Sequence, residues 1–201
     1  DLATGDQLAS LKIDSEPIVG VDLTAGGTLA LVGISGDVAL KQLDGSLDLT
    51  PQKRIKLGAN ALLSVAGNQS TVWTGNDKGK VFAVDLLSGE SRQLGGWALN
   101  RKIMDLVLAP DGAVLAAHAH EVFEFPADSK LEGEFRAAWR LPLSRTCREI
   151  RDLAVNHELG LLVCAQGLGE VSLFRLTDDA PQLIFRQLLP DDLHSVAVSA
   201  D

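Results

Sequence analysis

The chain has 201 residues, of which 46% are hydrophobic and 22% charged, and its 18 basic and 27 acidic side chains give a formal net charge of −9. This charge disfavours nucleic-acid binding, because phosphate contacts need clustered lysines or arginines. No apolar run approaches the length of a membrane span, so the sequence predicts no membrane-spanning helix.

The N-terminal part of the chain predicts a succession of short strands. Residues 1–14 indicate the end of one strand followed by an alternating strand over 6–13. An apolar strand is expected at 18–23, and the turn TAGG leads from it into the second apolar strand, LALVG. A turn at Ser35-Gly36-Asp37 opens a third strand, and the charged stretch 51–56 predicts an exposed outer strand that resists edge pairing.

The same order of elements returns three more times along the chain. Apolar first strands are expected at 61–66, 103–108 and 150–155, each followed by a turn (GNQS, APDG or NHEL) and a second apolar strand. The third strands alternate between apolar and polar residues, as in KVFAV at 80–84, which is the period of a strand. The chain closes on SVAVSAD, which indicates a further first strand over 195–199.

The spacing of these copies indicates the fold. Aligning the second strands places Val32, Thr74, Ala117 and Cys164 at equivalent positions, 42, 43 and 47 residues apart. A period of about 40 to 45 residues with four short strands is the pattern of a β-propeller blade. Glycine, proline, asparagine and aspartate interrupt the apolar segments too often for a helical repeat.

We therefore predict an all-β fold, a β-propeller, built as one array over residues 1–201 with four complete four-stranded antiparallel blades plus partial blades at both ends. The complete blades are expected at about 18–57, 59–94, 103–141 and 150–188, and the partial blades at 1–14 and 194–201. A blade formed by joining the two ends would have a first and a fourth strand but no second and third strands. The chain is therefore expected to be part of a longer propeller whose open edges are covered by more chain or another polypeptide. The alternative is a small protein that pairs its edges with another copy.

Two stretches, LAPDGAVLAA at 108–117 and TGNDKGKVFAVD at 74–85, resemble the WD-repeat β-propellers, and DLATG and DLLSG fit the same place in the repeat. The resemblance covers nearly the whole chain. No copy carries the Gly-His pair of that family, and none ends in Trp-Asp. Other propeller families, including a bacterial periplasmic kind with DLATG-like turns, therefore stay open.

The sequence contains no Gly-x-Ser-x-Gly nucleophile, no Cys-x-x-Cys and no carboxylate-rich metal loop. With the repeats, this favours a non-catalytic protein–protein interaction platform or scaffold subunit within a multi-subunit complex, without a cofactor. Loops between blades, and between second and third strands, should share one rim and contact the protein partner. The expected contact residues are Glu16, Asp77, Lys78, Trp97, Arg101, Lys102, His118, His120, Arg148 and His194.

The alternative function is a propeller enzyme or periplasmic accessory factor that uses His118, His120 and His194 near the central channel. His118 and His120 would point to the same side if the backbone between them were extended, and such a pair could ligate a metal or serve a redox cofactor. The glycines of Gln166-Gly167-Leu168-Gly169 do not predict a phosphate site, because a strand and not a helix follows them.

Two further residue types bear on packing and compartment. Trp73 lies within a second strand and is expected in the core. The two cysteines do not make a disulfide framework, and we expect free thiols, with Cys164 buried as a small hydrophobe. Free thiols favour a cytoplasmic location, with the periplasm as the alternative.

Overall fold

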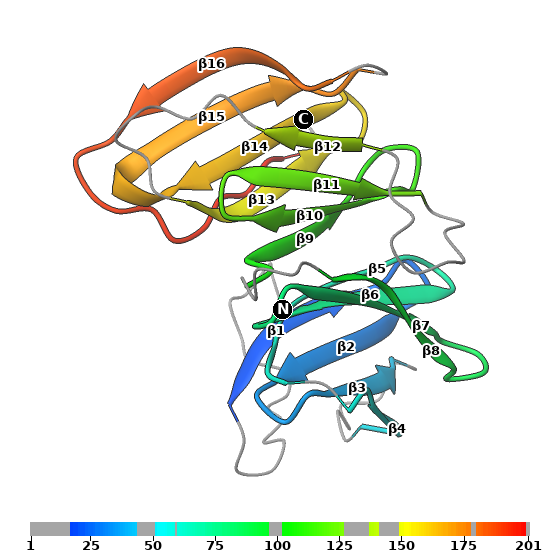
Figure 1. Ribbon diagram of the computed structural model, residues 1–201. Coiled ribbons are helices and arrows are strands. Elements are labelled where there is room, and N and C mark those ends of the chain that lie inside the picture. The colour runs from blue at the N-terminus through cyan, green and yellow to red at the C-terminus, as the bar shows by residue number, and fades with distance from the viewer. Residues whose placement is uncertain are drawn as a thin grey trace, which may run out of the picture.

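The computed structural model describes residues 17–43, 51–58, 60–96, 102–126, 137–140, 149–177 and 180–199. These residues form four antiparallel sheets, each built from four strands that are consecutive in the sequence and adjacent in the sheet (Figure 1). Over the described residues there is no α-helix, and the one helical turn is the 3-10 turn Gly167–Gly169. The all-β prediction is confirmed at this level.

The strand bounds follow the chain. The first sheet holds β1 (Ile18–Leu23), β2 (Thr28–Gly33), β3 (Asp37–Gln42) and β4 (Lys53–Lys56). The second sheet holds β5 (Leu62–Gly67), β6 (Thr71–Asn76), β7 (Lys80–Asp85) and β8 (Ser91–Gly96). The third sheet holds β9 (Asp105–Leu108), β10 (Val114–His118), β11 (Glu121–Phe125) and β12 (Ala137–Arg140). The fourth sheet holds β13 (Ile150–Asn156), β14 (Leu161–Gln166), β15 (Glu170–Arg175) and β16 (Gln182–Leu188).

The sheets lie within the four predicted blade ranges, apart from β8, which extends two residues further. Turn chemistry explains why the strands end where they do. Gly27, Gly79 and Gly112 have φ values of 77°, 79° and 84°, a left-handed conformation that costs glycine little. The side chain of Asn76 accepts the N–H groups of Lys78 and Lys80 at 3.0 and 2.8 Å and so closes the β6–β7 turn. The predicted partial blade at 1–14 lies outside the described residues.

Three apolar clusters fill the spaces between successive sheets, because alternate residues of each strand face opposite neighbours. In β10, Val114 and Ala116 pack towards the second sheet, whereas Leu115 and Ala117 pack towards the fourth. Trp73 is fully buried between the second and third sheets, which confirms its predicted core position. The sheets are therefore stacked face to face in chain order.

The first strands of the sheets lie beside one another in the same order. β5 contacts both β1 and β9, and β9 contacts β13. The four sheets remain separate in their hydrogen bonding, so no backbone ladder joins these first strands. Side chains join them instead: the Oδ2 atom of Asp22 accepts the Gly67 N–H at 2.7 Å, and that of Asp105 accepts the Leu153 N–H at 2.9 Å.

The pairing register corrects the alignment made from sequence. The first pairs after the bulges of β1, β5 and β13 are Gly20–Val32, Ser64–Gly75 and Asp152–Ala165, and β9 begins with Asp105–Ala117. The equivalent second-strand residues are therefore Val32, Gly75, Ala117 and Ala165. Placing Thr74 and Cys164 in this set was wrong by one residue. The second strands are nearly continuous apolar runs, and such runs do not specify register.

Residues 193–199 follow the last strand and run beside β13. The Val196 N–H donates to Oδ2 of Asp152 at 2.7 Å, and Nδ2 of Asn156 donates to the Ser199 carbonyl at 2.6 Å. Asp152 precedes Asn156 in the chain, and their partners Val196 and Ser199 follow in the same order, so the segment is parallel to β13. The predicted first strand at 195–199 thus lies against the preceding sheet, without a ladder of its own over the described residues.

Candidate functional site

The β6–β7 turn meets the segment that leads into the third sheet. The Asp77 N–H donates to the Ala61 carbonyl at 3.0 Å, and the Ile103 N–H donates to the Asn76 carbonyl at 3.0 Å. These bonds bring the exposed Lys102, next to Ile103, close to Asp77 and Lys78. Three of the residues expected on the rim are therefore neighbours in space.

A hollow of about 390 Å³ opens beside this turn, between the β4–β5 connection and β8. Its lining residues are Leu57, Gly58, Asn60, Asn76, Lys78, Lys80, Phe82 and Gln93. Two lysines line it and none of these residues is acidic. The Lys78 side chain is 45% exposed and lies 3.8 Å from Asp77, a surface ion pair of small value. Sequence reasoning named Lys78 but missed Lys80, although both lie beside the same turn.

The β10–β11 turn has a corresponding contact with the next sheet, since the Ile150 N–H donates to the Ala119 carbonyl at 2.7 Å. His118 is 3% exposed, and its ring lies edge-on to Phe123 with centroids 6.3 Å apart. His118 therefore does not present its ring to a partner, contrary to the expectation. Ala119 has a φ of 54°, so the backbone between His118 and His120 is not extended and the same-side condition fails.

The β14–β15 turn makes contacts of the same kind as the β6–β7 and β10–β11 turns. The Gly167 N–H donates to the Glu149 carbonyl at 3.0 Å, and the Leu168 N–H donates to Oδ1 of Asp192 at 3.0 Å. His194 is exposed two residues beyond Asp192. In the second, third and fourth sheets, the turn after the second strand thus contacts the segment before the next first strand. Four expected contact residues, Glu16, Trp97, Arg101 and Arg148, lie outside the described residues.

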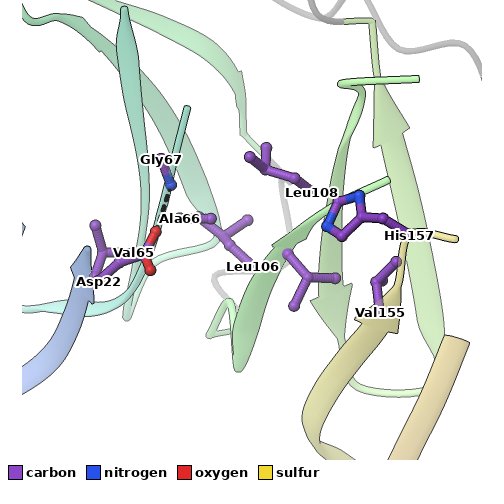
Figure 2. Close-up of a pocket in the computed structure, with 9 residues that line it drawn as sticks. Asp22, Val65, Ala66, Gly67, Leu106, Leu108, Val155 and His157 are labelled. Carbon is purple, nitrogen blue, oxygen red and sulfur yellow. Dashed lines mark hydrogen bonds between the residues drawn. The ribbon is translucent and has the colours of Figure 1, made fainter. Parts of the chain in front are cut away.

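A second hollow, of about 240 Å³, lies where the first strands of all four sheets end (Figure 2). Its lining residues are Asp22, Val65, Ala66, Gly67, Leu106, Val107, Leu108, Val155 and His157. Figure 2 shows Asp22 and His157 on opposite sides of it. Both Asp22 carboxylate oxygens accept backbone N–H groups, from Leu23 and Gly67. Burial raises the Asp22 pKa, and these two bonds oppose that rise.

Asp105 and Asp152 form an acidic pair on the first strands of the third and fourth sheets, β9 and β13. Burial is the main cause that raises the Asp105 pKa to about 8, and the neighbouring Asp152 carboxylate adds to it. Burial, with the Asp105 charge, raises the Cys164 pKa, so this free and fully buried thiol is unreactive. Asp105 accepts an N–H from Leu153 of β13 and Asp152 accepts one from Val196 in the segment after β16, which is a structural use of the pair.

A buried polar chain lies within the fourth sheet. Nε2 of Gln166 donates to Oγ of Ser172 at 2.8 Å, and Ser172 donates to Oε1 of Glu170 at 3.2 Å. Nε of Arg186 reaches the same Glu170 oxygen at 3.1 Å from the outer strand β16. Glu170 is 2% exposed, so the Arg186 cation compensates a desolvated carboxylate. Sequence reasoning singled out neither Glu170 nor Arg186.

The structure does not gather the histidines proposed for a metal or redox site. His118 is buried beside Phe123, whereas His194 is exposed beyond the fourth sheet. Across the described part of the chain, no group of three or more His, Cys, Asp or Glu side chains could hold a metal ion. Those same residues include no helix that is long and apolar enough to cross a membrane.

No protein-family model matches the chain, and no curated protein matches it.

Proposed function

We propose that the chain is a non-catalytic protein-interaction platform, a scaffold subunit built on a WD-repeat-like β-propeller array. The observation that carries this proposal is the repeated link between first strands. Asp22–Gly67 and Asp105–Leu153 join neighbouring sheets by the same kind of bond and with the same stagger, at positions two residues apart in the repeat, as expected if each sheet is a blade around a shared axis. The order of strands within each sheet, and of sheets along the chain, agrees with that arrangement.

The partner would dock where the blade turns meet the connections between blades. On this rim, Lys78 and Lys80 line a hollow, and Lys102 lies beside it. These lysines stand out in a chain whose net charge is −9. They favour a partner segment that carries carboxylates, because complementary charge guides encounter and fixes orientation. The free, buried Cys164 supports the cytoplasm as the proposed compartment, with the periplasm as the alternative.

The test compares partners recovered with tagged wild-type protein and with the triple variant Lys78→Ala, Lys80→Ala, Lys102→Ala, using cross-linking and mass spectrometry. Lys56→Ala, which removes an exposed lysine of the outer strand β4, is the matched control. We expect the triple variant to lose cross-links between this rim and a partner while its melting temperature is unchanged. The control should keep them. An unchanged set of cross-links in the triple variant would contradict the proposed surface.

A further inference from the structure

The first residue of the third strand carries a different charge in the second sheet from that in the other three sheets. Strands β3, β11 and β15 begin with the acidic residues Asp37, Glu121 and Glu170. Strand β7 begins with Lys80. The pairing of each third strand with its second strand places these four residues at equivalent positions. The second sheet therefore presents a cation where the other three sheets have an acidic side chain.

Lys80 faces the space between the first and second sheets. Alternate residues of a strand point to the same side, so Lys80 shares its face with Phe82 and Val84. Val84 packs in the apolar cluster between these two sheets, Phe82 is 8% exposed, and Lys80 is exposed. This face of β7 therefore changes from apolar to cationic on the way to the β6–β7 turn. The hollow of about 390 Å³ lies at this change, because Lys80 and Phe82 both line it.

The fourth sheet shows how a charge at this position is compensated within the chain. There Glu170 has the place of Lys80, and Nε of Arg186 on the outer strand lies 3.1 Å from its carboxylate. In the second sheet, the strand registers give Gln93 the place of Arg186. The described part of the chain gives Lys80 no ion-pair partner. A carboxylate that completes the pair would therefore come from a ligand.

The chain around the hollow is basic, although the whole chain is acidic. Residues 51–80 contain five lysine or arginine side chains and one acidic side chain, Asp77, whereas the net charge of the whole chain is −9. Asp77 lies 3.8 Å from Lys78 and does not line the hollow. The hollow is therefore a place that attracts an anion, because complementary charge guides encounter.

The hollow has room for more than a carboxylate. Its volume of about 390 Å³ lies within the range of ligand pockets, about 300 to 1,000 Å³. Gly58 on its wall has a φ of 59°, and a Cβ added there would meet no atom within 4 Å. Phe82 and Leu57 give the same hollow an apolar surface beside the lysines. This combination fits a ligand that joins an acidic group to an apolar one.

Building on the interaction platform proposed above, we propose that this hollow is a pocket for an acidic residue of the partner segment and for an apolar residue close to it. The carboxylate lies between the ammonium groups of Lys80 and Lys78. The apolar side chain lies against Phe82 and Leu57. An extended segment places two such side chains on one face when they are two residues apart.

The test uses the isotope-labelled 201-residue protein and a pentapeptide with blocked ends, leucine-serine-glutamate-serine-leucine. One control peptide has glutamine in place of glutamate, and a second has alanine in place of both leucines. An NMR titration should show saturable shifts of the Gly58, Lys78 and Lys80 amides with the first peptide. Each control peptide should bind at least tenfold more weakly. Equal affinities of the glutamate and glutamine peptides, or no saturable shifts of these amides, would overturn the proposal.

Two matched pairs of protein variants test the charge of the pocket. Lys80→Glu gives β7 the charge of the other third strands and should weaken binding of the glutamate peptide at least tenfold. Lys56→Glu is its control, because Ile55 faces the second sheet and Lys56 therefore faces away from it. The control should bind as the wild type does. Equal losses in these two variants would overturn the proposal.

The second pair adds a side chain to the wall of the hollow. Gly58→Asp and Gly58→Asn introduce side chains of equal size, and both residue types tolerate the positive φ of this position. Gly58→Asp should bind the glutamate peptide at least tenfold more weakly than Gly58→Asn, because only the former repels a carboxylate. Equal binding by the two variants would contradict a carboxylate in the hollow.

Two further comparisons separate the pocket from its alternatives. Isovalerate carries a carboxylate and an isobutyl group without a peptide backbone, and binding as tight as that of the glutamate peptide would overturn a partner segment in favour of a free organic acid. If the lysine triple variant loses its cross-links but the glutamate and glutamine peptides bind equally, the platform stands and the acidic anchor fails. If the glutamate peptide binds selectively but the cross-links persist, the pocket stands and the proposed docking surface fails.

Discussion

The Asp105 carboxylate, which belongs to the third sheet, accepts the backbone N–H of Leu153 in the fourth sheet at 2.9 Å. An acidic side chain here takes the role that a backbone carbonyl has inside a sheet. The bonds of Asp22 to Gly67 and of Asp152 to Val196 have the same form. Single carboxylates thereby set the offset between neighbouring first strands, whose backbones are not joined by a ladder.

This relationship predicts a pH dependence of stability. The Asp105 pKa is about 8 in the folded chain, against an ordinary value of 3.8, so the folded state keeps a proton that the unfolded state loses. The contribution of Asp105 to the free energy of unfolding should therefore be fully present below pH 4 and fall as the pH rises to about 8, by at most about 1.4 kcal/mol per pH unit. Asp105→Asn should remove that fall, as measured by urea unfolding from pH 5 to 9.

Asp85→Asn is the control for this experiment. Hydrogen bonds from Ser88 lower the pKa of Asp85, so its contribution is lost only as the solution becomes acidic. Its removal should leave the slope between pH 5 and 8 unchanged. An Asp105→Asn protein with the wild-type slope would show that the charge on Asp105 does not govern stability in this range.

The Glu170–Arg186 pair predicts a coupled stability effect. Arg186→Met leaves the buried Glu170 carboxylate without its cation and should reduce the free energy of unfolding by about 2 kcal/mol, since Arg186 is itself partly exposed. Adding Glu170→Gln should recover part of that loss, because a neutral amide is less costly to bury. Urea unfolding of both single variants and the double variant measures the coupling. Additive losses would mean that the two side chains do not act as a pair.

A glycine substitution at Leu168 should not lower the free energy of unfolding, unlike most glycine substitutions. Its φ of 66° costs an L-residue about 1 kcal/mol or more, and its side chain is exposed. Leu168→Gly should therefore be neutral or stabilise the protein by up to about 0.5 kcal/mol, once the greater freedom of unfolded glycine is included. Leu159→Gly, at an exposed turn position without a positive φ, should destabilise by about 0.5 to 1 kcal/mol. Thermal unfolding compares the two, and equal losses would contradict the strain at Leu168.

The positions of the strands could be predicted because local signals agree. Strand β1 spans Ile18–Leu23, which is the range that its apolar run predicts. The turn at Asn76–Gly79 lies where its polar residues predict a turn. Register was harder to predict. Runs such as TVWTG and LLVCA contain no charged residue that marks one face, so Thr74 and Cys164 were each placed one position away from the true equivalents.

The contacts around the candidate site could not be predicted from the sequence, because they join residues that are far apart in the chain. Asp22 and Asp152 look like ordinary solvated aspartates in strands, and their partners are 45 and 44 residues away. His118 was expected on the rim because it ends a strand beside a turn. The left-handed conformation of Ala119 and the ring contact with Phe123 accompany its burial instead. Glu170 becomes recognisable as a buried charge only when Arg186 is seen beside it.

The stacking order has a consequence for how the molecule comes apart. Each sheet packs mainly against its neighbours in the chain, so the second and third sheets are covered on both faces, whereas the outer two present apolar side chains such as Val21, 61% exposed, and Leu188, 65% exposed. In such a linear array, stability is a sum of units and of the interfaces between neighbours. For these 201 residues by themselves, the first and fourth sheets should therefore fray first as cooperative units, and the second and third should melt last.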